Sequence, residues 1–211
     1  MQTAVLFDLD GVIIDTEGQY TTFWEEIGRR DFPQHTNFAK DIKGHTLKQI
    51  LSAYYPNNPT AQQRVVDDIN RFESKMDFPL IKGAVDFVKA LRKANILTAV
   101  VTSSNQAKMQ VLSKRQPQLL SLFDHVFTAE NTKRSKPAPD CYLNAAAHFG
   151  LKATDCFVFE DSISGLQAGR DSGATIVALT TSNPREVVAP YAKLVINDFT
   201  EITVAQMCQL K

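Results

Sequence analysis

The sequence has few of the features that mark secreted or membrane proteins. Its three cysteines are odd in number and widely spaced in apolar surroundings, which is typical of reduced thiols and not of a disulfide framework. No apolar run reaches the roughly 20 residues that a membrane span needs. The N-terminus has neither a basic region nor a cleavable apolar stretch. These absences predict a cytoplasmic protein with no membrane partner.

An excess of charge of one sign is also missing. The 23 lysines and arginines balance the 23 aspartates and glutamates, which gives a formal net charge of zero. A nucleic-acid-binding protein should show a basic surplus, so this balance predicts no nucleic-acid partner. The 211 residues, of which 44% are hydrophobic and 22% charged, fit a globular protein with one domain and an insertion, or with two small domains.

Short apolar runs alternate with helical patterns through most of the chain. Because the apolar runs are nearly continuous, they are typical of parallel strands that are covered on both faces. The predicted strands are 4–7, 97–101, 125–127, 156–159, 175–178 and 194–196. The predicted helices between and after them are 84–94, 105–115, 139–149, 163–172 and one near 199–209. This alternation predicts an α/β fold with a doubly wound, mainly parallel sheet.

One stretch breaks this alternation. From about residue 17 to 78 the sequence shows only helical patterns. The clearest of them has apolar side chains at spacings of four, three and four, a single stripe that we expect in a core: Val65, Ile69, Phe72 and Met76. We therefore expect a core domain of residues 1–15 and 79–211 and a small α-helical cap domain of residues 16–78, inserted after the first strand.

Two carboxylates, Asp8 and Asp10, follow the first predicted strand and precede Gly11. In an open α/β sheet, ligands bind outside the carboxyl ends of the strands, so this pair lies where a site is expected. One carboxylate could attack an electrophile while the other moves a proton. The alternative interpretation is a simple Asp-Gly turn after a strand.

A second acidic pair, Glu160 and Asp161, follows the strand at 156–159 and precedes Ser162. Carboxylates at two strand ends would repel one another unless a cation lay between them, and oxygen ligands without His or Cys favour Mg²⁺ over zinc. The alternative is helix capping, for which Asp and Ser are both suited. Both interpretations can hold, with Ser162 capping the next helix and Asp161 at the metal.

Two further elements suit a phosphate group. The strand at 97–101 runs into Thr102 and Ser103, a hydroxyl-rich turn that opens a helix and offers hydroxyl and N–H groups to an anion. Ordinary N-capping is the alternative for this turn. Lys136 precedes Pro137, and the fixed backbone there holds the lysine in place.

In this order, the four elements resemble motifs I to IV of the haloacid dehalogenase superfamily of phosphohydrolases, over nearly the whole chain. Motifs I to IV are, in turn, Asp8-Leu9-Asp10-Gly11-Val12, Thr102, Lys136-Pro137-Ala138-Pro139 and Glu160-Asp161-Ser162. The helical insert is similar to the small cap of the β-phosphoglucomutase and phosphoglycolate phosphatase branch.

The resemblance implies an Mg²⁺-dependent enzyme that acts on a small phosphorylated metabolite through an aspartyl-phosphate. Asp8 would be the nucleophile and Asp10 the general acid and base, with Thr102 and Lys136 completing the catalytic set. The metal would be held by Asp8, Asp10 through its carbonyl, Asp161 and, directly or through water, Glu160. The phosphate would be held by Leu9, Asp10, Thr102, Ser103 and Lys136, in part through main-chain N–H groups.

The resemblance also places a Lys-Gly loop of the cap over the site. That loop is Lys43-Gly44 here, followed by His45, and Gln19 and Tyr20 lie on the first cap helix. These five residues are the candidate specificity residues. A solvated cap surface is the alternative interpretation for them.

Hydrolysis of a small phosphomonoester, with a sugar phosphate as the leading substrate class, is the favoured function. A hexose-phosphate mutase is the alternative, although Leu47 or Lys48 stands where β-phosphoglucomutases carry an arginine, and Tyr20 stands near their cap histidine. A phospho-receiver and a non-catalytic sugar-phosphate sensor are weaker hypotheses from other classes. We expect a monomer or weak dimer. Asn131 stands where many members of the superfamily carry an acid, and the sequence offers no reason.

Overall fold

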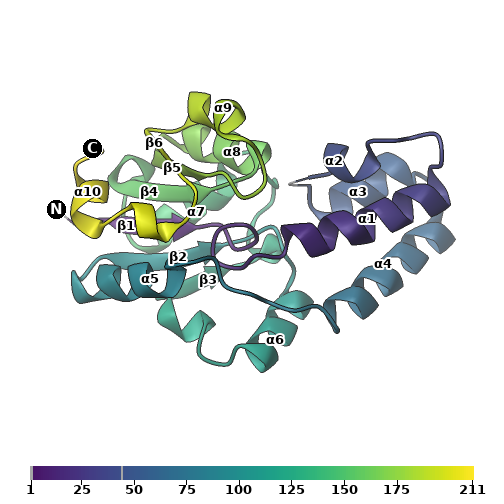
Figure 1. Ribbon diagram of the computed structural model, residues 1–211, viewed down its shortest axis with the longest axis horizontal. Coiled ribbons are helices and arrows are strands. Elements are labelled where there is room, and N and C mark those ends of the chain that lie inside the picture. Colours follow the sequence, from purple (N-terminus) through teal and green to yellow (C-terminus); the bar gives the residue numbers. More distant parts are fainter. Residues whose placement is uncertain (1, 44) are drawn as a thin grey trace.

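The computed structural model describes residues 2–43 and 45–211, and its centre is a six-stranded sheet with helices on both faces (Figure 1). Every pair of neighbouring strands is parallel, in the order β3-β2-β1-β4-β5-β6. The predicted doubly wound α/β fold is therefore confirmed. The strands are β1 (Ala4–Phe7), β2 (Leu97–Val101), β3 (His125–Phe127), β4 (Cys156–Glu160), β5 (Thr175–Leu179) and β6 (Leu194–Ile196).

The alternation of side chains along β1 separates two hydrophobic cores. Val5 and Phe7 point into one core, and Ala4 and Leu6 into the other, and all four are fully buried. The first core is covered by α5 (Ala84–Lys93), α6 (Gln106–Arg115) and α10 (Val204–Cys208). The second is covered by α7 (Asp140–His148), α8 (Ile163–Ser172) and α9 (Arg185–Val188). A strand buried on both faces is why its sequence reads as a continuous apolar run.

The helix predicted near 199–209 is shorter than expected. The chain forms a 3₁₀ turn at Phe199–Glu201 and then the separate helix α10. Asp198 caps the turn by accepting from the Thr200 N–H. Thr203 caps the start of α10 through a capping box with Gln206. Two N-caps five residues apart divide the helical pattern into two pieces.

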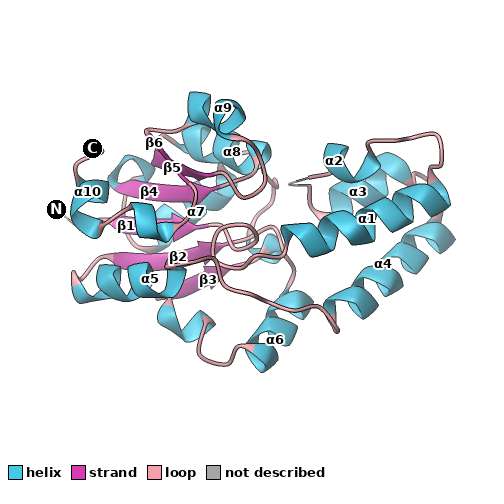
Figure 2. Cartoon of the chain, in the orientation of Figure 1, coloured by secondary structure: helices cyan, strands magenta, loops and turns pink. Residues whose placement is uncertain are grey.

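Between β1 and α5, the described chain consists of helices and loops, seen at the right of Figure 2. These helices pack around a third hydrophobic cluster, which includes Phe23, Trp24, Phe38 and Val65. They are α1 (Glu17–Asp31), α2 (Phe38–Asp41), α3 (Leu47–Tyr54) and α4 (Pro59–Glu73). The exact domain boundaries stay a prediction.

The predicted apolar stripe of α4 is correct for three of its four residues. Val65 and Ile69 are buried among the four insert helices, and Phe72 packs against the same cluster. Met76 instead packs in the first core of the sheet, because α4 ends at Glu73 and Met76 lies beyond the helix. Helical spacing alone could not show where the helix stops.

The order of the strands fixes where a site can form. From β1, the chain builds outward to β2 and β3 on one side and later to β4, β5 and β6 on the other. The sheet therefore has its switch point between β1 and β4, where the loops diverge and leave a crevice at the carboxyl ends. The four insert helices lie beyond this end of the strands, and both termini lie at the other (Figure 1). Among the described residues, no helix has the length and apolar character to cross a bilayer.

Candidate active site

Residues from all four predicted motifs meet at the switch point, in one cavity of about 780 Å³ between the sheet and the insert helices. Asp8 directly follows β1, and Asp161 directly follows β4, the neighbouring strand. Thr102 directly follows β2, on the other side of β1. The parallel register carries these strand ends to one edge, so residues that are far apart in sequence line the same space.

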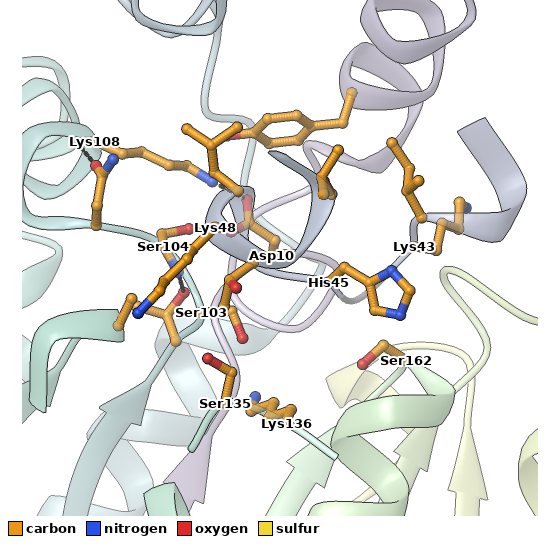
Figure 3. Close-up of a pocket in the computed structure, with 18 of the residues that line it drawn as sticks. Asp10, Lys43, His45, Lys48, Ser103, Ser104, Lys108, Ser135, Lys136 and Ser162 are labelled. Carbon is orange, nitrogen blue, oxygen red and sulfur yellow. Dashed lines mark hydrogen bonds and ion pairs between the residues drawn. The ribbon is translucent and has the colours of Figure 1, made fainter. Parts of the chain in front are cut away.

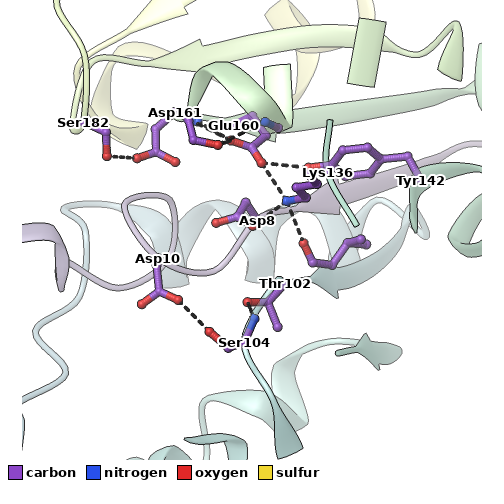
Figure 4. A network of polar contacts seen from close by, with 12 residues as sticks. Asp8, Asp10, Thr102, Ser104, Lys136, Tyr142, Glu160, Asp161 and Ser182 are labelled. Atoms are coloured by element: carbon purple, nitrogen blue, oxygen red, sulfur yellow. Dashed lines mark hydrogen bonds and ion pairs between the residues drawn. The ribbon is translucent and has the colours of Figure 1, made fainter. Parts of the chain in front are cut away.

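Lys136 joins the two acidic pairs. Its Nζ donates to the Asp8 Oδ1 at 2.6 Å and to the Glu160 Oε1 at 2.7 Å (Figure 4). It also donates to the Val101 carbonyl at 3.2 Å. The lysine is 3% exposed. A buried ammonium needs all three of its protons to be accepted, and here they are. Lys136 thus lies between Asp8 and Glu160, and its predicted catalytic role stays a prediction.

Glu160 is fully buried, and its carboxylate is held from several sides. Besides Lys136, the Tyr142 hydroxyl donates to Oε1 at 3.1 Å. Oε2 accepts from the main-chain N–H groups of Asp161 and Ser162, at 2.8 and 2.9 Å, and from the Ser162 hydroxyl. These contacts use the oxygens that a metal would need. They assign Glu160 to the anchoring of Lys136 and of the turn into α8, which sequence patterns do not reveal.

The turn after β4 is held by capping and by the loop after β5. The Ser162 hydroxyl accepts from the Gly165 N–H at 3.1 Å, which confirms that Ser162 caps α8. The Ser182 hydroxyl donates to the Asp161 carboxylate, and the Asn183 side chain donates to the Asp161 carbonyl at 3.0 Å. The loop that carries Ser182 and Asn183 was not among the predicted site elements, although it follows the predicted strand at 175–178 and so lies at the same edge of the sheet.

Burial leaves negative charge at this edge of the sheet without full compensation. It raises the pKa of the Asp8 carboxyl to about 7, because loss of solvent outweighs the attraction of Lys136. Burial and the charge of Glu160 raise the pKa of Asp161 well above its ordinary value. Burial lowers the pKa of Lys136, but the charges of Asp8 and Glu160 raise it by a larger amount. The net shift is upward, so the lysine stays cationic. A cation beside Asp8 and Asp161 would stabilise the charged forms of both carboxylates.

The donor set fits a hard cation held partly by the main chain. Among residues 2–43 and 45–211, no cluster of three or more His, Cys, Asp or Glu side chains is placed to hold a metal. Two carboxylates, those of Asp8 and Asp161, remain at the adjacent ends of β1 and β4. Oxygen-only donors of this kind suit Mg²⁺, which keeps several waters and takes few protein carboxylates.

Asp10 points toward hydroxyl and ammonium groups. Its Oδ1 accepts from the Thr16 hydroxyl and from Lys108, and its Oδ2 accepts from the Ser104 hydroxyl at 3.0 Å. Gly11, next in the chain, has φ +77°, and a side chain there would collide with the Asp161 carboxylate. The turn after β1 therefore requires glycine. Lys108 was missed, because one lysine in a helical pattern looks like a surface residue.

The predicted phosphate-binding residues lie in different settings. The Thr102 Oγ1 accepts from the Ser104 N–H at 3.0 Å, and both Thr102 and Ser103 line the cavity. The Leu9 side chain is fully buried in the core, so only its main chain could meet a phosphate. Asn131 accepts from the Thr128 N–H at 2.7 Å and so closes the 3₁₀ turn that precedes the Lys136 segment.

The candidate specificity residues divide between the cavity and the segment by which the chain returns from the insert to the sheet. Tyr20, Lys43 and His45 line the cavity, and Figure 3 shows Lys43 and His45 there. Lys43 pairs with Glu17 at 3.3 Å. Gly44 lies outside the described residues. Gln19 does not line the cavity, because both ends of its amide bond the main chain of Asp77, at 2.9 and 3.0 Å. Its contacts brace the point where the chain returns to the sheet.

The profile of haloacid dehalogenase-like hydrolases matches residues 2–173. The chain belongs to this hydrolase family. The predicted resemblance to this superfamily is thus confirmed, and members of the family generally use Mg²⁺. Fructose-1-phosphate phosphatase YqaB of Escherichia coli is 32% identical over 182 residues, which are 82% of this hydrolase and 94% of that protein. Suppressor of quenching 1 of Arabidopsis thaliana is 27% identical over 210 residues, which are 93% of this chain but only 19% of that protein.

Solved structures agree with the fold of the hydrolase. A family IA, variant 3 haloacid dehalogenase hydrolase from Entamoeba histolytica superposes with a TM-score of 0.86 at 29% identity, over 100% of this chain and 99% of that one. The β-phosphoglucomutase of Clostridium difficile superposes with a TM-score of 0.80, over 100% of this chain and 97% of that one. An identity of 21% shows that the two proteins share a fold, and it says nothing about their activities.

Proposed function

We propose that this hydrolase is a phosphatase that hydrolyses a small phosphomonoester, with a sugar phosphate as the leading class of substrate. The observation that carries the proposal is the Lys136 ammonium, which lies within 2.7 Å of both the Asp8 and Glu160 carboxylates beside the cavity. A buried carboxylate held by a cation next to a hydroxyl-rich turn suits attack on a phosphoryl group. The similar curated phosphatases support the same reaction class.

In the first step, an Asp8 oxygen attacks the phosphorus, and the bond from phosphorus to the ester oxygen breaks. Asp10 donates a proton to the departing oxygen, which leaves as an alcohol. Thr102 and Lys136 offset the negative charge on the transferring group. The product of this step is an aspartyl-phosphate on Asp8.

In the second step, water replaces Asp8 on the phosphorus. Asp10 takes a proton from the water molecule while the oxygen of that water bonds to the phosphorus. The bond between the phosphorus and the Asp8 oxygen breaks. Inorganic phosphate leaves, and both aspartates return to their starting protonation. One carboxylate thus serves as acid and then as base, which is why two are needed.

We propose Mg²⁺ as the cofactor, held by Asp8, Asp161 and the main-chain carbonyl of Asp10. When bound, it offsets the negative charge that Asp8 and the phosphate bring together. The raised pKa values of Asp8 and Asp161 support this assignment. Glu160 was predicted as a further ligand, and its contacts favour the anchoring of Lys136 instead.

We also propose a division of labour between the predicted domains. Residues 1–15 and 79–211 would carry the phosphoryl chemistry, and residues 16–78 would enclose the alcohol part of the ester. Insert residues line one side of the cavity, with Tyr20, Lys43 and His45 among them. The same wall is partly apolar, through Trp24 and other side chains of the insert, and it suits the carbon face of a small polyol.

A mutase is the second candidate. Lys48 and Lys133 line the same cavity, one from the insert and one from the core, and they could hold the second phosphate of a bisphosphate intermediate. A mutase would return that phosphate to the sugar and would release little of it to water.

The substitution Asp8→Asn tests the reaction class. It keeps the shape of the side chain and removes the nucleophilic charge, so we expect loss of turnover with the fold intact by circular dichroism. The matched control is Asp86→Asn, at an exposed position in the first turn of α5. If Asp8→Asn kept metal-dependent phosphatase activity, the proposal would be wrong.

A screen of small phosphate esters with Mg²⁺ tests the substrate class. Glucose 1-phosphate with glucose 1,6-bisphosphate belongs in the screen, and phosphate release and sugar-phosphate isomerisation are measured separately. We expect release from sugar phosphates. Isomerisation without release would favour the mutase. Phosphorylation of Asp8 without turnover of any ester would favour a receiver.

A further inference from the structure

Lys108 is a buried lysine that the reaction scheme above does not use. It lies in the first turns of α6 and is 1% exposed. Its ammonium forms an ion pair with the Asp10 carboxylate, the proton-transfer group of the proposed function. On its other side, it lies 4.5 Å from the centre of the Tyr20 ring, which belongs to α1 of the insert. Lys108 therefore contacts both parts of the molecule.

The chain of contacts continues into the insert. The Tyr20 hydroxyl donates to the Glu73 Oε1 at 2.7 Å, at the end of α4. Glu73 is buried and lines the cavity, as do Tyr20, Lys108 and Asp10. Burial raises the pKa of Glu73, although the charge of Lys108 opposes this rise. Asp10, Lys108, Tyr20 and Glu73 are therefore coupled across the boundary between sheet and insert.

The geometry limits what Lys108 can be doing. An ammonium removed from water is costly unless it is paired, and a carboxylate and an aromatic face are the partners that this one has. Asp10 keeps two neutral donors in Thr16 and Ser104, so it does not need a cation merely to be hydrogen-bonded. The charged contact fixes the direction of the carboxylate, because it is the strongest of the three.

We propose that Lys108 is a positioning residue for Asp10, and that its contacts with Tyr20 and Glu73 make the placement of Asp10 depend on the insert. This inference rests on the proposed function. Lys108 itself touches no reacting atom in the scheme. It holds the group that delivers a proton to the leaving oxygen, on the side of the cavity where the insert meets the ester.

The chemistry of the leaving group separates positioning from a merely structural role. An alkoxide needs a proton as it departs, whereas the p-nitrophenolate ion is stable without one. A misplaced Asp10 therefore slows attack on alkyl phosphates and spares attack on p-nitrophenyl phosphate. The ratio kcat/KM reports the first transfer step, so slower hydrolysis of the aspartyl-phosphate does not obscure the comparison.

The main variant is Lys108→Met, which keeps a long apolar stem and removes the charge. The matched control is Lys114→Met, an exposed lysine on the same helix. Two substrates are used: p-nitrophenyl phosphate and the alkyl phosphate that the wild type hydrolyses fastest in the ester screen. We expect kcat/KM to fall about 10- to 100-fold for the alkyl phosphate and less than about 3-fold for the aryl phosphate, in line with the cost of misplacing a catalytic group.

Equal losses on both substrates, or no loss, would overturn the positioning role of Lys108. A wild type that hydrolyses no phosphate ester would refute the proposed function itself, so the two failures are distinguishable. Glu73→Gln tests the link to the insert and serves if Lys108→Met does not fold. It keeps the hydrogen bond from Tyr20 and removes the charge, and we expect the same selective loss to a smaller extent. A non-selective result for Glu73→Gln would overturn the dependence on the insert.

Discussion

The carboxylate of Glu160 occupies the space that a side chain on Gly165 would need. A Cβ at Gly165 would lie 1.6 Å from the Glu160 Oε1, the oxygen that accepts from Lys136. Gly165 lies in the first turn of α8, where a glycine ordinarily weakens a helix. The close approach of the Glu160 carboxylate explains why this position requires glycine. It also links Gly165 to the Lys136 ammonium, which Glu160 and Asp8 share.

Gly165→Ala should therefore lower activity through Glu160. The added methyl group displaces the carboxylate, which frees Lys136 from one of its two acidic partners. We expect kcat to fall about 100-fold, as for other misplaced catalytic groups, and the free energy of unfolding to drop by about 1–3 kcal/mol. Steady-state kinetics and urea unfolding measure the two effects.

The control for this substitution is Gly18→Ala. Gly18 is also a helical glycine, in α1, but a Cβ there would meet nothing within 4 Å. We expect unchanged kinetics and a gain of about 0.5–1 kcal/mol from helix propensity. Equal behaviour of the two variants would contradict the role assigned to the Glu160 carboxylate.

Without divalent cations, the stability of the protein should fall as the pH rises from about 4 to 7. The pKa of Asp8 is raised from 3.8 to about 7 in the folded state, so over this interval the folded protein binds more protons than the unfolded chain. Stability therefore decreases with pH. Mg²⁺ should raise Tm more at pH 8 than at pH 5, by at least about 2 °C. Thermal melts in EDTA and in Mg²⁺ measure this, and Asp8→Asn should remove most of the difference.

Asp31 should stabilise the insert helices at neutral pH. It accepts from Arg30 and Arg64, each at 2.9 Å, and from the Tyr55 hydroxyl at 2.7 Å. Burial alone would raise the pKa of Asp31, but the hydrogen bonds from Arg30 and Tyr55 lower it below 3.8 overall. We expect Asp31→Asn to cost about 1–2 kcal/mol, because the charged hydrogen bonds are weakened.

The pH dependence of this cost has a definite sign. A lowered pKa means that the contribution of Asp31 is present in full above about 4 and is lost as the pH falls below it. The difference between wild type and Asp31→Asn in urea unfolding should thus be constant from pH 7 to 5 and shrink toward pH 3. Asp67→Asn, at an exposed position on α4, should change stability by less than about 0.5 kcal/mol. A difference that grew on acidification would contradict this assignment.

The three thiols should differ sharply in reactivity. Burial raises the pKa of Cys141 and of Cys156 to about 11, whereas Cys208 is exposed. The thiolate is the reactive form, so the two buried thiols should be inert in the native state. We expect an aromatic disulfide reagent at pH 8 to modify one thiol rapidly in the folded protein and three in urea. Rapid modification of the folded Cys208→Ser variant would show that a buried thiol is accessible.

The sequence by itself determined the layers of the molecule and the place of the site. Short, nearly continuous apolar runs between helical patterns are typical of strands covered on both faces, and all six were predicted at nearly their observed bounds. Carboxylates that directly follow such strands must lie at one edge of a parallel sheet. Asp8, Thr102 and Asp161 could therefore be placed together before any contact was known.

Only the tertiary structure decided which partners these groups have. Glu160 is an acidic residue beside Asp161 and so looks like a metal ligand in the sequence. In the structure, its carboxylate oxygens accept hydrogen bonds from Lys136, Tyr142 and two main-chain N–H groups. Lys108 has the spacing of a surface lysine, but it is buried against Asp10. Periodicity records which face of an element is apolar. Burial and the partners of a polar group depend on which elements pack together, and distances of a few ångströms between distant segments decide them.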